Sequence, residues 1–147
     1  GSAEDAAAIL EIQKLAYATE AEIYGDWTIE PLHETLEEMR EAIAGQVVLK
    51  AVCGGRIIGS VRGREEGGTC FVGRLIAHPG EWNRGVGGKL MNALEKSFPG
   101  ARRAELFTGF RSEKNLHFYS RHGYRKMRIE KVNEKLQFVF LEKTLKP

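Results

Sequence analysis

The sequence predicts a mixed α/β (α+β) sandwich that forms one domain over residues 1–147. Two helical patterns come first, and three short strand patterns joined by tight turns follow them. The third strand pattern leads through a glycine-rich turn and a helix into a fourth strand. Consecutive strands joined by tight turns are antiparallel, whereas a crossover through a helix joins parallel strands. The combination predicts a mixed sheet flanked by helices and argues against a doubly wound nucleotide fold.

The size and composition suit one soluble globular domain. A chain of 147 residues buries enough surface to form a core without disulfides. Its 42% hydrophobic and 29% charged residues are ordinary for such a domain. No apolar run approaches the roughly 20 residues of a membrane helix, and the first residues do not resemble a secretory signal. We therefore expect a cytoplasmic protein that does not bind membranes.

The cysteines and the charge narrow the expected partners. Cys53 and Cys70 lie in strand-like apolar stretches without metal-ligand spacing, which predicts reduced thiols and no metal. A net charge of +2 does not by itself indicate nucleic acid, and none is expected as a partner. Basic residues cluster at Arg102-Arg103 and over 121–131, either as a solvated surface or as a rim that attracts a polyanionic ligand.

Two helices are predicted before the sheet. Apolar residues on one face of the first are Ile9, Ile12, Ala16 and Ile23. Gly25 and Asp26 would end this helix. The second has an apolar stripe at i, i+4, i+7 and i+11, formed by Leu32, Leu36, Met39 and Ile43. Pro31 suits its first turn and Gly45 its end, so one continuous helix is expected between them.

Strands and helices alternate over the rest of the chain. The first three strand patterns are Gln46–Cys53, Arg56–Arg64 and Gly68–Ala77, with Gly54-Gly55 as a tight hairpin between the first two. A helix over Val86–Phe98 is predicted next, with Val86, Leu90 and Leu94 pointing inward. The remaining elements are a strand over Arg103–Thr108, a helix over Glu113–His122, and strands over Tyr124–Val132 and Leu136–Lys143.

The glycine-rich turn Asn83-Arg84-Gly85-Val86-Gly87-Gly88 opens the helix that follows the third strand. The first N–H groups of a helix have no carbonyl partner within it, and the helix dipole adds positive charge there. Glycines leave these amides open to a phosphate, and Arg84 is a candidate for a further charged contact. The same turn equally suits a tight strand-to-helix connection without a ligand.

Three segments match, in order and spacing, the motifs of one family: Ala77-His78-Pro79, Arg84-Gly85-Val86-Gly87-Gly88, and Phe118-Tyr119-Ser120-Arg121-His122-Gly123-Tyr124. With them the sequence resembles the GNAT superfamily of acyl-CoA-dependent N-acetyltransferases. A T-G-x-x-S-x-x-N segment from Thr108 to Asn115 is similar to one branch of it. The resemblance implies a mostly antiparallel sheet, splayed in the middle and flanked by helices. The family's first strand is apparently absent before Glu4-Asp5-Ala6.

The resemblance implies acetyl-CoA as co-substrate, held in a gap between the strands Gly68–Ala77 and Arg103–Thr108. Residues implied to bind it are Leu75, Ile76 and Ala77 along the pantetheine arm, Asn83, Arg84, Gly85, Val86, Gly87 and Gly88 at the pyrophosphate, and Ser112 and Asn115. The sequence departs from the family at Trp82, where glutamine or arginine is usual. Ser112 replaces a common asparagine, and Asn115 replaces alanine. Ser112 is also a good helix N-cap.

The resemblance implies direct attack of an amine on the thioester, with a backbone amide at Leu75–Ala77 stabilising the oxyanion. Tyr119 lies where the family's general acid protonates the thiolate, and its other interpretation is a core aromatic beside Phe118. Glu105 is the candidate base. Related enzymes use a glutamate at the position of Phe107, and Glu105 is the nearest carboxylate on that face. Its other interpretation is a strand residue paired with an arginine.

The amine acceptor is expected against the first two helices, where residues 20–34 are rich in carboxylates that suit a cationic amine. The expected acceptor is a primary amine of a small molecule or a peptide. A non-catalytic acyl-CoA sensor and a module that binds another nucleotide are the competing hypotheses. The apolar final strand, with Phe138 to Leu141, is a candidate edge for a homodimer.

Overall fold

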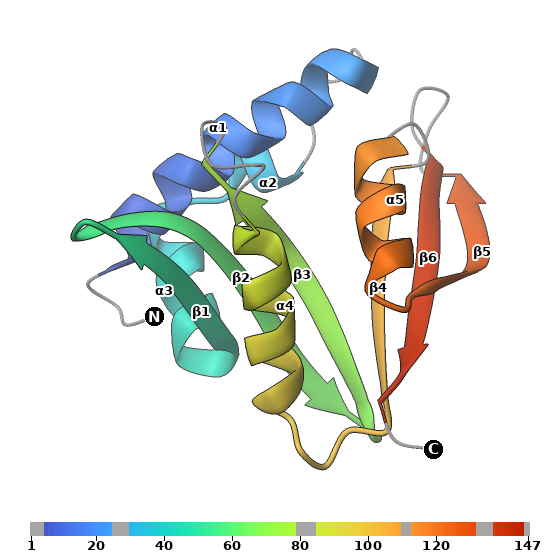
Figure 1. Ribbon diagram of the computed structural model, residues 1–147. Helices are drawn as coiled ribbons and strands as arrows, with labels where there is room; N and C mark the ends of the chain where they lie inside the picture. The colour runs from blue at the N-terminus through green and yellow to red at the C-terminus, as the bar shows by residue number, and fades with distance from the viewer. Residues whose placement is uncertain (1–4, 25–29, 79–84, 110–112, 132–136, 146–147) are drawn as a thin grey trace.

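The structure is a computed structural model that describes residues 5–24, 30–78, 85–109, 113–131 and 137–145 (Figure 1). Its elements in chain order are α1 (Ala6–Tyr24), α2 (Glu30–His33), α3 (Leu36–Gly45), β1 (Val47–Cys53), β2 (Arg56–Glu66), β3 (Thr69–Ala77), α4 (Val86–Lys96), β4 (Arg103–Gly109), α5 (Glu113–Arg121), β5 (Arg125–Lys131) and β6 (Gln137–Thr144).

The six strands form one sheet in the order β1-β2-β3-β4-β6-β5. Only β3 and β4 are parallel, and every other neighbouring pair is antiparallel. The parallel pair is joined through α4, which lies on the same face of the sheet as α5, while α1 and α3 lie on the opposite face (Figure 1). The mixed, mostly antiparallel sheet that the sequence predicts is thereby confirmed. We name its two sides the α4/α5 face and the α1/α3 face.

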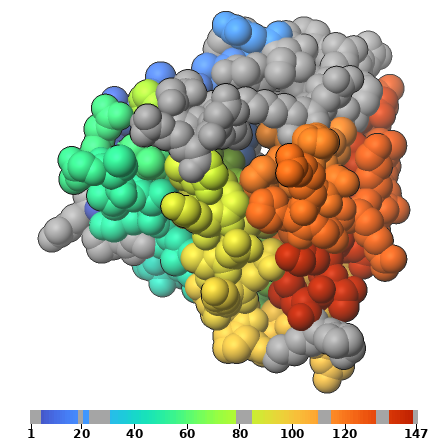
Figure 2. Space-filling view, in the orientation of Figure 1, coloured from blue at the N-terminus to red at the C-terminus, as the bar shows by residue number. Residues whose placement is uncertain are grey.

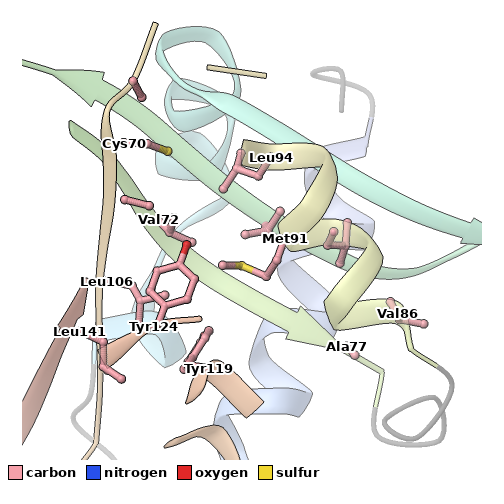
Figure 3. Close-up of a cluster of buried hydrophobic side chains, with 14 of the residues drawn as sticks. Cys70, Val72, Ala77, Val86, Met91, Leu94, Leu106, Tyr119, Tyr124 and Leu141 are labelled. Atoms are coloured by element: carbon pink, nitrogen blue, oxygen red, sulfur yellow. The ribbon is translucent and has the colours of Figure 1, made fainter. Parts of the chain in front are cut away.

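Each face of the sheet has its own buried cluster. On the α4/α5 face, Met91 and Leu94 of α4 pack with Leu106, Tyr119 and Tyr124 (Figure 3). On the α1/α3 face the buried residues include Ile9, Ile12, Met39, Val48 and Ile76. Alternation along each strand sends neighbouring side chains to opposite faces, so one strand contributes to both clusters.

The continuous second helix predicted from Pro31 to Gly45 is wrong, because the structure breaks it into α2 and α3. Thr35 has an extended backbone and caps α3: its Oγ1 accepts from the Glu38 N–H at 3.1 Å. Its own N–H donates to Glu38 Oε1 at 2.9 Å, which completes a capping box. The Thr-x-x-Glu spacing in the sequence is a capping-box signature. The apolar stripe continues across the break, however, and favours one continuous helix. The break brings the preceding residue, Glu34, into the protein interior.

The final strand is not an edge strand, so the predicted dimer edge there is wrong. β6 lies between β4 and β5 and pairs with both. The edge strand on this side of the sheet is β5, which exposes the side chains of Arg125, Lys126, Arg128 and Lys131. Charged edge strands resist pairing with another sheet. The clustering of basic residues over 121–131 thus coincides with a solvated strand.

The capping box gives a first prediction. Replacing Thr35 by alanine should lower the free energy of unfolding by about 1 kcal/mol, because one N–H at the start of α3 loses its acceptor. Urea denaturation measures this change. Glu41→Ala, at an exposed position of the same helix, is the matched control and should leave the midpoint nearly unchanged. Equal stability of the two variants would contradict the cap.

Candidate active site

The parallel strands β3 and β4 pair at one end only. Their register runs from Thr69 opposite Arg103 to Phe71 opposite Glu105. The described residues form no further pair between these strands, although β3 continues to Ala77 and β4 to Gly109. The two strands diverge beyond the paired end, as Figure 1 shows. The facing edges of both strands therefore present backbone groups to the space between them.

A β-bulge lies in β3 where it leaves β4. Ser60 of β2 is opposite Ile76, and Arg62 is opposite Gly73, so β3 has one residue more than β2 over this stretch. Arg74 lies inside the bulge with φ of 51°, and it is the one non-glycine residue of the described chain with a positive φ. A side chain in this conformation costs about 1–2 kcal/mol, so surrounding contacts must stabilise it.

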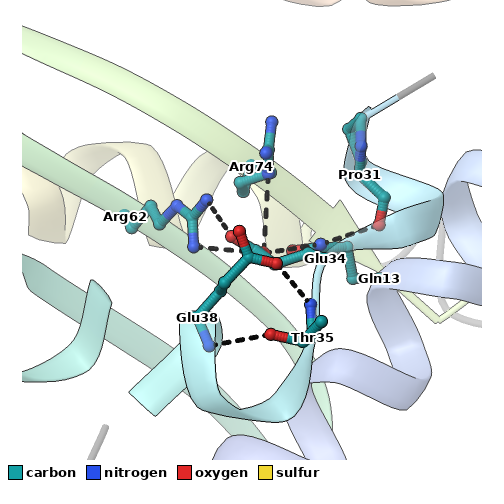
Figure 4. Close-up of polar contacts among 7 residues, drawn as sticks. All are labelled: Gln13, Pro31, Glu34, Thr35, Glu38, Arg62 and Arg74. Carbon is teal, nitrogen blue, oxygen red and sulfur yellow. Dashed lines mark hydrogen bonds and ion pairs between the residues drawn. The ribbon is translucent and has the colours of Figure 1, made fainter. Parts of the chain in front are cut away.

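A buried polar network lies against the bulge on the α1/α3 face (Figure 4). Arg74 Nε lies 3.8 Å from Glu34 Oε1. Glu34 also accepts from both terminal nitrogens of Arg62, at 2.8 and 3.3 Å. Gln13 Nε2 donates to Glu34 Oε1 at 2.8 Å and to the Pro31 carbonyl at 3.0 Å. One carboxylate thus links α1, the α2–α3 junction, β2 and the bulge.

The environment of Glu34 keeps it ionised. Burial alone would raise its pKa, but hydrogen bonds from Arg62 and Gln13 and the charges of Arg62 and Arg74 outweigh burial. The pKa of Glu34 is therefore lowered from its ordinary value of 4.5. Glu34 was expected within a carboxylate-rich segment that attracts a cationic amine, but its carboxylate is already paired. Its arginine partners lie on distant strands, so no local signal revealed this role.

The glycine turn opens α4 with a left-handed residue. Gly85 is the N-cap, with φ of 74°, and no side chain caps the helix. Lys89 N–H donates to the Gly85 carbonyl at 3.2 Å. The N–H groups of Val86, Gly87 and Gly88 precede that bond, so α4 itself offers them no carbonyl. These are the amides that the sequence predicts to bind an anion, and that role stays a prediction. The predicted contacts at Asn83 and Arg84 lie outside the described residues.

The packing of α5 against α4 explains why glycine occupies positions 87 and 88, which the sequence did not indicate. A Cβ on Gly87 would lie 3.1 Å from the Phe118 ring, and one on Gly88 would lie 3.2 Å from the His122 ring. The surfaces of α4 and α5 meet on this face (Figure 2). These two glycines allow α5 to approach α4 closely. At Gly85, by contrast, the requirement is the positive φ, because a Cβ there would meet nothing within 4 Å.

The predicted pantetheine-binding residues form the free end of β3. Ile76 is buried on the α1/α3 face, whereas Ala77 is buried and Leu75 partly buried on the α4/α5 face. Gly59 and Ser60 of β2 pair with Ala77 and Ile76 along one edge. The opposite edge faces the space between β3 and β4. The bulge and this edge therefore lie on the same stretch of chain.

Tyr119 comes from α5 and lies in the buried cluster of the α4/α5 face, 8% exposed (Figure 3). Its ring stands edge-on to Phe118 at 5.2 Å and to Tyr124 at 5.9 Å. Tyr124 in turn donates its hydroxyl to Glu95 Oε2 at 3.2 Å. The core interpretation of Tyr119 matches this packing, and its role as an acid stays a prediction.

Asn115 and Glu105 are both engaged with neighbours. Asn115 Nδ2 lies 3.4 Å from Thr108 Oγ1, which links the start of α5 to the end of β4. Ser112 lies outside the described residues. Glu105 Oε1 accepts from Arg103 at 3.1 Å, as the alternative to its role as a base predicts. Its role as the base stays a prediction.

The described residues contain neither a metal-binding cluster nor a helix that could span a membrane. In that part of the chain no group of three or more His, Cys, Asp and Glu side chains is arranged to hold a metal ion. None of the helices described is long and apolar enough to cross a membrane.

The sequence matches the profile of the "Acetyltransferase (GNAT) family" over residues 7–124. The chain therefore belongs to this family of acetyltransferases, as the three sequence motifs indicated. The narrower resemblance to the branch with the T-G-x-x-S-x-x-N segment stays a prediction. A search of curated protein sequences finds no match.

Solved structures of acetyltransferases share the fold. PaiA N-acetyltransferase from Thermoplasma acidophilum, in complex with coenzyme A, superposes with a TM-score of 0.80 at 17% identity, covering 98% of this chain and 95% of that one. Ribosomal-protein-alanine N-acetyltransferase from Brucella melitensis gives 0.76 at 16% identity, covering 99% and 97%. An aminoglycoside 6'-N-acetyltransferase complexed with coenzyme A gives 0.72 at 18%, covering 93% and 90%. At these identities the likeness concerns the fold alone.

The lowered pKa of Glu34 predicts how stability depends on pH. The group stabilises the fold fully above pH 4.5 and loses that contribution as the pH falls through its folded pKa. Glu34→Gln should cost about 3 kcal/mol at pH 7, because it breaks a buried pair and leaves Arg62 without its counter-charge. The difference between wild type and variant should shrink in acid below pH 4.5.

Thermal unfolding at pH 7 and in mild acid measures this pH dependence. Glu66→Gln is the matched control, because Glu66 pairs with Arg64 on the surface. Exposed ion pairs contribute little, so this control should melt like wild type. A Glu34→Gln difference that stays constant with pH would contradict the assignment.

Proposed function

We propose that this protein transfers the acetyl group of acetyl-CoA directly to a primary amine of a small molecule or a peptide. The observation that carries the proposal is the divergence of β3 from β4 beside the start of α4. Strand edges that have no further β3–β4 pair among the described residues, and helix N–H groups that have no carbonyl within α4, then lie at one place. Membership of the GNAT family supports it, and so do structural neighbours that were solved with coenzyme A.

The proposed position of acetyl-CoA follows from these backbone groups. The pantetheine amides would bond the free edge of β3 at Leu75, Ile76 and Ala77. The pyrophosphate would bind the N–H groups at the start of α4, where the dipole is positive. Asn83 and Arg84 would extend this site, and Ser112 and Asn115 would contact the cofactor from the start of α5. No side chain needs to supply the anion site, which makes the substitution at Trp82 tolerable.

The reaction breaks one bond and forms another. The amine nitrogen attacks the thioester carbon, a C–N bond forms, and the C–S bond then breaks. Negative charge develops on the carbonyl oxygen, where a backbone amide of Leu75, Ile76 or Ala77 would stabilise it. The departing thiolate would take its proton from Tyr119. Glu105 is the candidate to accept the amine proton. A chain of waters is the other route, and the hydrogen bond of Glu105 to Arg103 favours that route.

The glycine turn gives a test of the cofactor site. Gly85→Ala should weaken acetyl-CoA binding by about tenfold, because a strained residue at the N-cap displaces the amides behind it. Calorimetric titration measures the Kd. Gly67→Ala is the matched control, since Gly67 also has a positive φ, of 57°, and open space around it, but lies in the β2–β3 hairpin. Equal affinity of both variants would exclude the proposed anion site.

Tyr119→Phe tests the general acid. The rate of amine acetylation should fall by about a hundredfold, because the thiolate loses its proton donor, while acetyl-CoA affinity stays the same. Tyr124→Phe is the matched control, because it removes a buried hydroxyl from the same aromatic cluster. That control should lose stability and keep its turnover. Full activity of Tyr119→Phe at saturating amine would disprove the assignment.

Thiol release measures turnover, and the cysteines of the protein affect that assay. Cys53 is exposed and Cys70 is buried. Burial, with smaller effects from Glu95 and Glu65, raises the pKa of Cys70 to about 11. The thiolate is the reactive form, so Cys70 should not react with a thiol reagent at neutral pH. The Cys53→Ser variant removes the exposed thiol of the protein that would also react with the reagent.

The binding and thiol-release assays also distinguish two competing functions. A non-catalytic acyl-CoA sensor would bind acetyl-CoA without releasing thiol across a panel of amines. A module for another nucleotide would be stabilised by ATP or NAD instead. Thermal stabilisation by acetyl-CoA alone, together with thiol release that depends on an amine, would exclude both.

A further inference from the structure

Three phenylalanine rings form a continuous surface on the α1/α3 face, beyond the helices that cover β1 to β3. Phe107 of β4 lies 4.5 Å from Phe138 and 5.3 Å from Phe140, both of β6, measured between ring centroids. Phe107 is 48% exposed, although large aromatic side chains normally gain stability from burial. We call these three residues the aromatic wall.

The aromatic wall begins where the two parallel strands separate. Glu105 is the last residue of β4 that pairs with β3, and Phe107 is the next residue on the same face. Leu106, between them, points to the opposite face and into the cluster with Tyr119. Phe107 therefore flanks the opening between β3 and β4 on the side away from α4 and α5.

The two sides of this opening differ in how much they are filled. On the α4/α5 face, Phe118 packs against Gly87 and Tyr119 is buried. The proposed cofactor site also occupies that face. A second substrate that reaches the same thioester must therefore approach from the α1/α3 face. There it passes the exposed ring of Phe107.

Two buried or partly buried carboxylates on that face are already engaged with arginines. Glu105 accepts from Arg103 at 3.1 Å, and Glu34 accepts from Arg62 at 2.8 Å. Both can therefore contribute little attraction for a polycation. An exposed aromatic ring attracts an apolar group through burial, and it attracts a single ammonium group through its π electrons. This chemistry favours an amine with one charge and an apolar body.

We infer that the aromatic wall binds the apolar body of the acceptor, which is an arylalkyl or alkyl primary amine, and that Phe107 determines this specificity. The inference rests on the proposed acetyl transfer and names its substrate class. Phe138 and Phe140 support Phe107 from the neighbouring strand. The Arg128 guanidinium lies over the Phe140 ring, 4.1 Å from its centroid, so Phe107 and Phe138 are the rings that would contact the body of the amine.

Matched amines test the inference. Thiol release in the Cys53→Ser background gives kcat/KM for 2-phenylethylamine, hexylamine, ethylamine and spermidine. The first two should exceed ethylamine and spermidine by at least about tenfold, the discrimination that a few buried methylenes provide. Phe107→Ala should lower that preference by about tenfold and leave the KM for acetyl-CoA unchanged. Phe107→Leu should keep most of the preference for hexylamine.

Ile129→Ala is the matched control. Ile129 is 61% exposed and lies opposite Val139, whose side chain is in the cluster of the α4/α5 face. The Ile129→Ala variant therefore loses an exposed apolar group on the α4/α5 face, and its order of preference among the amines should not change. A preference for spermidine, or an order of amines that Phe107→Ala leaves intact, would overturn the inference.

A failure of the proposed function gives a different result. If acetyl-CoA binds and no amine is acetylated, the acetyl transfer is wrong, and the wall is tested by binding alone. Calorimetric titration of 2-phenylethylamine into the protein with coenzyme A should then show an affinity that Phe107→Ala lowers about tenfold. Equal affinity of wild type and Phe107→Ala would overturn the wall as a binding site.

Discussion

The bulge in β3 is the constraint on which the rest of the site depends. Over the stretch where β2 runs from Ser60 to Arg62, β3 has one additional residue. This bulge bends β3 shortly after its last pair with β4. Without that bend the parallel pairing would continue, and the strand edges would bond to each other. The amides of Leu75 to Ala77 would then have no capacity for a ligand. The pairing of β3 with β2 continues to Ala77, whereas its pairing with β4 stops at Phe71. The sheet therefore opens between β3 and β4.

The buried network around Glu34 is what makes the bulge stable. A left-handed arginine costs about 1–2 kcal/mol, and breaking a buried ion pair costs about 3–5 kcal/mol. The network can therefore maintain the strained conformation. Its members come from α1, from the α2–α3 junction and from two strands. The helix break at Thr35 is part of this arrangement, because a continuous helix would not bring the Glu34 carboxylate to Arg62 and Arg74. The first helices thus shape the site even though the bulge lies in the sheet.

Most elements of the fold could be predicted from the sequence, because their signals are local. Periodicity identified the strands and α4, and the glycine turn identified the start of α4 with its open amides. The bulge could not be predicted in this way, since it depends on the register between two strands and arginine is not a residue that indicates a positive φ. Glu34 was invisible for a related reason: its partners are distant in sequence, and a lone carboxylate in an acidic segment reads as solvated. The aromatic rings of β6 were read as a possible dimer edge, because sequence does not show which strand is outermost.

The alternation of side chains along β4 and β6 puts the proposed cofactor site and the proposed acceptor surface on opposite faces of the sheet. Leu106, Val139 and Leu141 belong to the packed face, where Gly87 and Gly88 leave no spare volume beside α5. The residues between them, Phe107, Phe138 and Phe140, point the other way and are only partly covered. A change on the second set leaves the first set and the bulge in place, because the strand backbone lies between them. If the aromatic wall binds the acceptor as proposed, acceptor preference can change there without altering the geometry that would hold acetyl-CoA, so long as the buried network stabilises the bulge.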